Sequence, residues 1–133
     1  MAQPATGAGV VRLGQLTSEN YADSAERRVK NYMDKYTRDR VTMTKLRGIY
    51  SLVMNVYTRV NDAADYQRNK GDIQYLKVRM AYESGREASV KQFLEETSLR
   101  EQLGYITSYE QFMLFCRYAE SLVAYFKFYG GEE

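Results

Sequence analysis

The 133-residue chain is 44% hydrophobic and 27% charged, as is typical of one globular domain rather than of a disordered protein. The chain has no histidine and one cysteine, so it lacks the ligands of a zinc or di-iron centre and the imidazole of a Ser-His-Asp or Cys-His enzyme. We therefore expect no metal and no cofactor. Because a disulfide within the chain would need a second cysteine, we also expect a reducing, cytoplasmic location. The net charge is +2, but the charges are unevenly distributed: residues 1–71 hold 12 basic and 7 acidic side chains, whereas residues 72–133 hold 7 basic and 10 acidic ones. This separation suggests that the protein contacts a polyanion on one side and a protein neighbour on the other.

The first residues differ from the rest of the chain. Residues 1–15 are rich in glycine and alanine, contain the only proline and show no hydrophobic periodicity. They lack the positive segment and long apolar core of a secretory signal, and no stretch of the chain reaches the roughly 18 apolar residues of a membrane span. We therefore expect a flexible tail over 1–15 and a single helical domain over 16–133.

Apolar residues then recur with helical spacing. Thr17 or Ser18 can cap a first helix, one side of which repeats at intervals of three and four residues. That side consists of Tyr21, Ala25, Val29, Tyr32 and Tyr36. The polar, β-branched segment 38–44 is expected to end this helix.

The second predicted helix begins at Thr42 or Thr44 and runs to about Asn61. Its broad apolar side consists of Leu46, Ile49, Tyr50, Val53, Val56, Tyr57 and Val60. The opposite, polar side consists of Arg47, Ser51, Asn55 and Arg59. Small hydrogen-bonding groups between two arginines can follow a sugar–phosphate chain, but they also suit an ordinary exposed surface.

A third helix is predicted after a polar loop over 61–72. Gly71 is the expected turn point and Asp72 the expected cap. The inward side consists of Ile73, Leu76 and Met80. Another side alternates tyrosine with arginine and consists of Tyr75, Arg79, Tyr82 and Arg86. Stacking of an aromatic ring on a base contributes about 1–3 kcal/mol to binding, and arginine neutralises phosphate, so this side could bind nucleic acid. Alternatively, the tyrosines belong to the core and the arginines pair with Glu83 or Glu87.

Two more helices complete the pattern. The fourth covers roughly 86–103, and its apolar residues are Val90, Phe93, Leu94, Leu99 and Leu103. After a break at Gly104, Ser108 and Gln111 form a capping box before a last helix that is apolar almost all round and stops at Gly130–Gly131. Such a helix belongs in the middle of a bundle or in a subunit interface. The predicted fold class is all-α, a single compact bundle of about five helices.

The segment 27–47 is strongly basic. It contains eight lysines and arginines but only Asp34 and Asp39 as acidic residues. Such a segment contacts phosphates, or it is a solvated surface with cations at a helix C-terminus.

Three segments together resemble a known family. They are TKLRGIYSLVMNVY (44–57), YLKVRMAYESGRE (75–87) and AESLVAYFKFYGG (119–131). In this order and spacing they are similar to the small subunit of type III-A CRISPR–Cas (Csm) effector complexes, over about residues 17–131. The resemblance implies a non-catalytic helical bundle, present in several copies, that lies beside the guide RNA and its target RNA. It also implies contacts with the backbone and large subunits, to which the nuclease activities belong.

The candidate RNA-binding residues come from two sources. Those that match the family's basic helix start and central segment are Lys45, Arg47, Arg79, Tyr82 and Arg86. Those added from charge or helical spacing are Arg38, Arg40, Arg59 and Tyr75. We therefore predict a non-enzymatic RNA-binding subunit in antiviral defence. The alternatives are a helical adaptor that binds only protein, with the last helix as its docking surface, and an enzyme using carboxylates and lysine, against which the missing histidine counts.

Overall fold

The computed structural model describes residues 14–133, which form helices and no strand. The long helices are α1 (Tyr21–Lys35), α2 (Met43–Tyr57), α4 (Lys70–Arg86), α5 (Ala88–Thr97) and α7 (Tyr109–Phe128). The short ones are α3 (Ala63–Arg68), α6 (Leu99–Gln102) and the 3-10 helix η2 (Leu103–Tyr105). The all-α prediction is confirmed, and the prediction of about five helices agrees roughly with the seven α-helices of residues 14–133, of which five are long. The predicted tail, 1–15, lies almost wholly outside the described residues.

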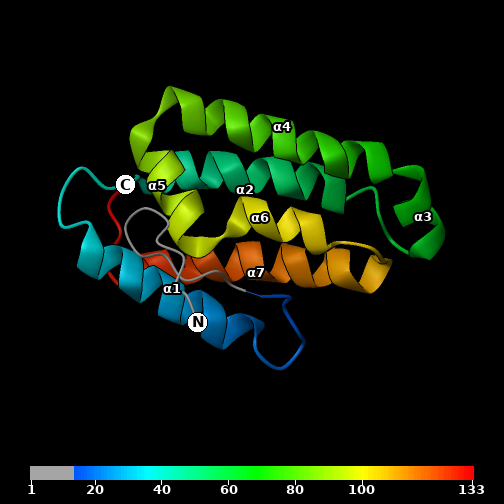
Figure 1. Ribbon diagram of the computed structural model, residues 1–133, viewed down its shortest axis with the longest axis horizontal. Helices are drawn as coiled ribbons and strands as arrows, with labels where there is room; N and C mark the ends of the chain where they lie inside the picture. Colours follow the sequence, from blue (N-terminus) through cyan, green and yellow to red (C-terminus); the bar gives the residue numbers. More distant parts are fainter. Residues whose placement is uncertain (1–13) are drawn as a thin grey trace, which may run out of the picture.

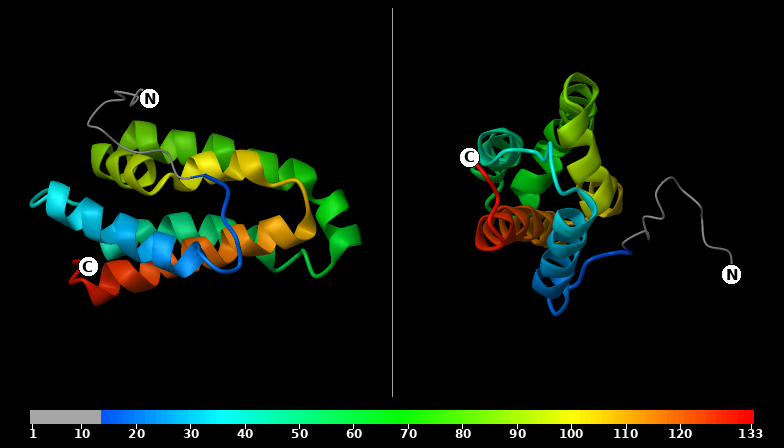
Figure 2. Two further views of the ribbon diagram at one scale, coloured as in Figure 1. Left: turned by 60° about the horizontal axis from the view of Figure 1, so that its bottom comes forward. Right: turned by 90° about the vertical axis from the view of Figure 1, so that its left-hand side faces the viewer.

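Helix α7 is the central element of the bundle. It packs against α1 on one side and α2 on the other, while α4 packs against α2 and α5, and α5 also contacts α1. Figure 1 shows α4 and α2 running side by side, and the end-on view of Figure 2 shows the helices surrounding one interior. The end of the chain, after α7, lies next to the beginning of α2, where the backbone N–H of Met43 donates to the carbonyl of Glu132 at 2.6 Å.

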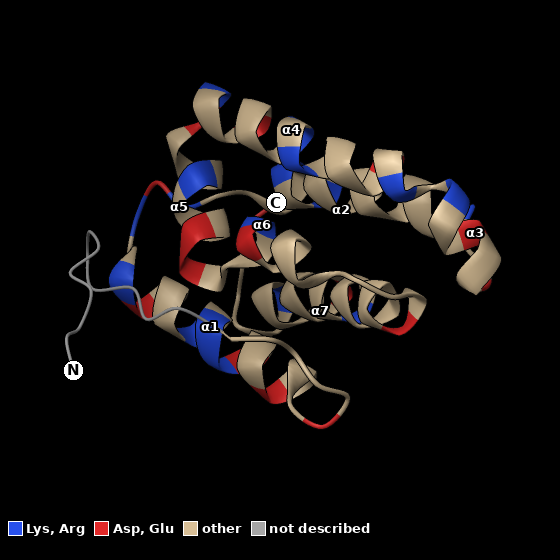
Figure 3. Cartoon of the chain, turned by 45° about the vertical axis from the view of Figure 1, so that its right-hand side comes forward, with Lys and Arg blue, Asp and Glu red and all other residues tan. Residues whose placement is uncertain are grey.

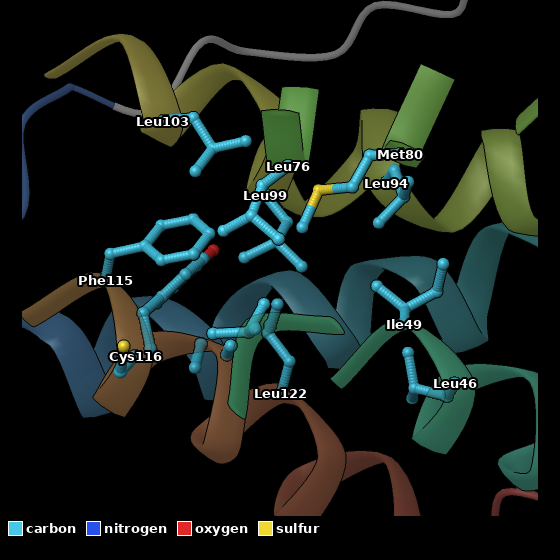
Figure 4. Packing of buried hydrophobic residues seen from close by; sticks show 14 of the residues in the cluster. Leu46, Ile49, Leu76, Met80, Leu94, Leu99, Leu103, Phe115, Cys116 and Leu122 are labelled. Atoms are coloured by element: carbon cyan, nitrogen blue, oxygen red, sulfur yellow. The ribbon is translucent and has the colours of Figure 1, made fainter. Parts of the chain in front are cut away.

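The predicted apolar sides meet in one core. Figure 4 shows leucine, isoleucine, methionine and phenylalanine side chains from α2, α4, α5, α6 and α7 pointing into it. Three aromatic rings connect α1, α5 and α7: Tyr32 and Phe93 are 4.9 Å apart between centroids, and Phe93 and Phe126 are 5.9 Å apart. Both pairs are edge-to-face, the geometry that aromatic quadrupoles favour. The periodicity of the first four predicted helices therefore predicted their buried sides correctly.

The predicted loop over 61–72 was wrong, and α2 ends at Tyr57 rather than at about Asn61. The side chain of Asp62 accepts a hydrogen bond from the backbone N–H of Asp65 at 2.8 Å and caps the short helix α3. This helix also buries Tyr66. A cap and one buried aromatic side chain are enough to hold a six-residue helix that has no periodicity of its own.

Helix α4 starts earlier than predicted. It begins at Lys70, so Gly71 lies in its first turn and makes no turn between elements. Asp72 is likewise inside the first turn and is not the cap. A carboxylate in this position is favourable because it faces the positive end of the helix dipole.

The predicted fourth helix is broken into α5 and α6 at Ser98, whose φ is 58°. At this break the guanidinium of Arg28 donates to the carbonyl of Glu96 at 3.2 Å, and the hydroxyl of Tyr118 donates to the carbonyl of Thr97 at 2.7 Å. Arg28 is buried, which fits neither of the two alternatives given for segment 27–47, phosphate contacts or a solvated surface. The side chains of α1 and α7 thus donate the hydrogen bonds that backbone N–H groups would have donated to these carbonyls if the helix had continued.

The predicted start of α7 is confirmed. Ser108 caps it by accepting from the N–H of Gln111 at 3.2 Å, while the Gln111 side chain accepts from the N–H of Thr107 at 2.8 Å, one residue before the cap. One side of α7 is buried against α1 and α2, but Phe128 is exposed, so the helix is not enclosed all round. No helix within residues 14–133 is long and apolar enough to cross a membrane.

Candidate nucleic-acid interface

A groove of about 320 Å³ lies between α2 and α4. Its lining comes mainly from the first half of α2 and the last part of α4, and Figure 1 shows that α2 begins and α4 ends at the same end of the bundle. Its apolar lining consists of Gly48, Ile49, Leu52 and Val90. Its charged lining consists of Lys45, Arg79, Glu83, Arg86 and Glu87. We call these five charged residues and four apolar residues the α2–α4 groove. An apolar surface with cations beside it suits an amphipathic anion, in which a flat ring accompanies a phosphate.

Local sequence explains why α2 contributes Lys45. The hydroxyl of Thr42 accepts from the backbone N–H of Lys45 at 3.3 Å and starts the helix there. Leu46 and Ile49 are buried and set the rotation of α2. Lys45 consequently lies at the edge of the buried side, in the first turn of the helix, where it faces α4.

The same reasoning applies to α4. Leu76 and Met80 are buried and orient this helix. Arg79, Glu83 and Arg86 follow at intervals of four and three residues and lie on the side that faces α2. Residues from two separate segments of the chain thus meet in one place. Figure 3 shows lysines and arginines along α4 and on α2 beside it.

Each cation of the groove has a carboxylate partner. The ammonium of Lys45 lies 2.8 Å from Glu87, while Glu83 lies 3.6 Å from Arg79 and 3.4 Å from Arg86. The hydrogen bond from Lys45 lowers the pKa of the Glu87 carboxyl group below its usual value. Three cations therefore face two ionised carboxylates, and the groove has a net charge of +1.

The tyrosines of the predicted alternating stripe do not line the groove. Tyr75 and Tyr82 are 56% and 59% exposed, with the similarly exposed Val78 between them on the outer side of α4. The alternative that these tyrosines belong to the core is therefore wrong. Tyr82 remains close to the groove, because the guanidinium of Arg86 lies 5.7 Å from its ring centroid, within the range of a cation–π contact.

Arg47 of α2 and Arg59, two residues after the end of α2, are exposed but lie outside the groove lining. Arg47 pairs with Glu133 at 3.3 Å, and Lys127 of α7 approaches the same carboxylate at 3.4 Å. Arg59 pairs with Asp72 at 3.2 Å, near the other end of α2. The predicted polar side of α2 is thus solvent-exposed and is spread along the whole helix.

The basic segment 27–47 does not form one surface. Arg40 donates to the carbonyls of Tyr36 and Met33, the latter at 2.9 Å, and so satisfies acceptors at the end of α1. Lys35 pairs with Glu96 at 3.1 Å. Arg38 is exposed in the connection between α1 and α2.

Sequence reasoning missed part of the groove. The contacts of Glu83 with Arg79 and Arg86 follow from helical spacing, and the pairing was recognised as an alternative. No sequence signal connects Glu87 with Lys45, since they are 42 residues apart. The apolar lining could not be recognised either, because Val90 looked like an ordinary core residue.

Other functional centres find little support. Residues 14–133 contain no group of three or more histidine, cysteine, aspartate or glutamate side chains that could hold a metal ion. Cys116 is buried in α7. Burial raises the pKa of its thiol to about 12, so the reactive thiolate is scarce at neutral pH.

Comparison with known proteins identifies the family. The family model described as Csm2 Type III-A matches residues 19–132. The chain belongs to the Csm2 type III-A family. The resemblance to the small subunit of type III-A Csm complexes is thereby confirmed, and the match includes every candidate residue named above.

Three curated relatives have the same description, CRISPR system Cms protein Csm2. The Streptococcus thermophilus protein is 38% identical over 120 residues, which cover 89% of this chain and 98% of that protein. The Enterococcus italicus protein is 32% identical, with 89% and 93% covered. The Mycobacterium tuberculosis protein is 34% identical, with 85% and 94% covered.

Proposed function

We propose that this Csm2 family member is a non-catalytic subunit that binds single-stranded RNA along the guide and target path of a type III-A effector. The observation that carries the proposal is the convergence of Lys45, Arg79 and Arg86 from two helices on one exposed groove. Its partners would be guide or target RNA, the backbone and large subunits of the complex and further copies of itself.

The groove is suited to contact RNA without reading its sequence. Lysine and arginine bound to phosphate position a nucleic acid but carry no base information. Tyr82, exposed beside Arg86, could stack on a base of any identity. An effector with interchangeable guides requires this tolerance, since base pairing supplies its specificity.

The groove lacks the features of a nuclease centre. The chain has no histidine, and a general base at neutral pH needs a pKa near 7. Contact with Lys45 moves the pKa of Glu87 in the opposite direction. Cleavage of RNA is therefore assigned to other subunits.

One observation favours the adaptor as second candidate. Val78 lies between two exposed tyrosines on α4, and Phe128 at the end of α7 is 72% exposed. Contiguous exposed apolar side chains, such as Val78 with Tyr75 and Tyr82, can mark a protein contact. An adaptor would use these two surfaces and leave the α2–α4 groove empty of RNA.

Charge reversal tests the RNA contact. The double variants Lys45→Glu with Arg47→Glu, and Arg79→Glu with Arg86→Glu, should each weaken binding to unrelated single-stranded RNAs by similar factors. Each should also flatten the dependence of log K on log salt by up to about 1.4, because each lost phosphate contact on a single strand contributes about 0.7. Fluorescence anisotropy with labelled oligonucleotides over a salt series measures both quantities.

The matched control reverses two exposed arginines away from the groove, Arg27→Glu with Arg117→Glu. It changes the net charge equally but should leave the salt slope nearly unchanged. Thermal stability of all variants should stay near that of the parent, since the pairs are surface ion pairs worth about 0–1 kcal/mol each. If both double variants are folded and bind RNA like the parent, the adaptor is the better description.

A further inference from the structure

We propose that Glu83 and Glu87 act as internal competitors for phosphate that keep the RNA affinity of a single subunit low. This inference rests on the proposed function, because it concerns what an incoming RNA must displace. Its basis is that each cation of the α2–α4 groove is already bound to one of these two carboxylates.

Glu83 occupies the place between two arginines where a phosphate would bind. One of its oxygens faces Arg86 at 3.4 Å and the other faces Arg79 at 3.6 Å. Its side chain is 22% exposed, against 57% for Arg86 and 38% for Arg79, so the carboxylate lies deeper than the guanidinium groups. A phosphate has the same oxygen geometry for guanidinium and must therefore compete with it.

Glu87 competes in the same way at the other side of the groove. It connects the end of α4 to α5 and reaches Lys45 of α2 with a hydrogen bond of 2.8 Å. Both partners are about two-fifths exposed, so water and an incoming anion have access to the pair. The carboxylate is consequently a displaceable partner rather than a buried structural one.

The strength of these pairs decides what they can do. Solvent-exposed ion pairs shift an equilibrium by about two- to fivefold each. The three pairs of the groove together reduce the affinity for RNA noticeably but cannot prevent binding. An RNA strand that contacts several subunits at once adds the contributions of all grooves. A single groove would therefore release RNA readily, and only an assembled row of subunits would retain it.

The test removes the two negative charges and keeps the hydrogen-bonding capacity. The variant Glu83→Gln with Glu87→Gln removes all three pairs and should bind fluorescein-labelled oligouridine about eight- to 125-fold more tightly than the parent at low salt. Its salt slope should become steeper by up to about 1.4, because two more phosphate charges find unneutralised cations. A purely structural role of the glutamates would lower thermal stability without moving the salt slope.

The matched control is Glu110→Gln with Glu120→Gln, which removes two exposed negative charges from α7. Glu110 is in the first turn of α7, and Figure 1 shows that α7 begins at the end of the bundle opposite to the one where α2 begins. This control should change RNA affinity less than twofold. If the groove variant binds no more tightly than the control while the parent binds RNA, the competitor role is wrong and the proposed function stands. If neither the parent nor the groove variant binds RNA, the proposed function fails and this inference with it.

Discussion

At the scale of single residues, two consecutive glycines direct the chain out of α7, each for a different physical reason. Gly130 has φ 89°, which favours a residue without a side chain. Gly131 has no space for one, since a Cβ atom there would lie 2.2 Å from the ring of the fully buried Phe126. The turn brings the carbonyl of Glu132 to the N–H of Met43 at the start of α2. Two small residues therefore place the segment after α7 beside the first turn of α2, the helix that contributes Lys45 to the α2–α4 groove.

We predict that Gly131→Ala destabilises the protein by about 1–3 kcal/mol, because the added methyl group overpacks a core ring that cannot move away. Gly85→Ala is the control, since Gly85 lies within α4 and has no atom within 4 Å of an added Cβ. It should stabilise the protein by about 0.5–1 kcal/mol. Urea denaturation measures both changes, and a Gly131→Ala protein as stable as the parent would contradict the packing described here.

At the scale of elements, the junction of α5 and α6 is held by side chains from two other helices. Arg28 of α1 and Tyr118 of α7 donate hydrogen bonds to the last carbonyls of α5. The hydroxyl of Thr97 donates back to the carbonyl of Phe93 at 2.8 Å. Because these groups are buried, their hydrogen bonds position three helices relative to one another as well as ending one.

Tyr118→Phe should lower the free energy of unfolding by about 1–3 kcal/mol, because it leaves the carbonyl of Thr97 buried without its donor. Tyr109→Phe makes the same chemical change at an exposed place, where the hydroxyl donates to the carbonyl of Asn61 at 3.1 Å. Water can replace that bond, so the expected change is below about 0.5 kcal/mol. Chemical denaturation of the two variants in parallel provides the comparison, and equal losses would show that burial does not distinguish the two bonds.

At the scale of the whole molecule, the buried residues within 14–133 form one continuous core, from which we expect a single cooperative unit. Helix α7 contacts both α1 and α2, and buried residues from all long helices belong to the same cluster. Neither α4 nor α5 has a separate core of its own. The groove between α2 and α4 therefore exists only in the fully folded protein.

We predict that unfolding is two-state, with coincident transitions for secondary and tertiary structure. The chain contains 13 tyrosines and no tryptophan, so tyrosine fluorescence reports on packing while far-UV circular dichroism reports on helix content. Both signals should have the same midpoint in urea, and Tyr118→Phe should shift both by the same amount. Two separated transitions would mean that part of the bundle folds independently.

The buried sides of the long helices could be predicted from the sequence because they depend on local spacing. The helical period alone predicted the burial of Ile73, Leu76 and Met80, and the position of Ser108 before an apolar run predicted its role as a helix cap. Helix α3 could not be predicted in this way, because six residues contain too little periodicity. Its stability comes from a cap and from the burial of Tyr66, which depends on helices elsewhere in the chain.

The sequence by itself determined the helical class, the family resemblance and the lack of imidazole chemistry, since these follow from composition and from motifs within continuous segments. Which charges from separate segments of the chain meet depends on the tertiary structure. Lys45 and Glu87 are 42 residues apart and become neighbours only when α2 packs against α4. Arg28 lies off the apolar side of its helix, which by spacing alone indicates an exposed position, yet packing of α1 against α5 buries it. Charge pairing and burial depend on distances through space, which periodicity along the chain does not contain.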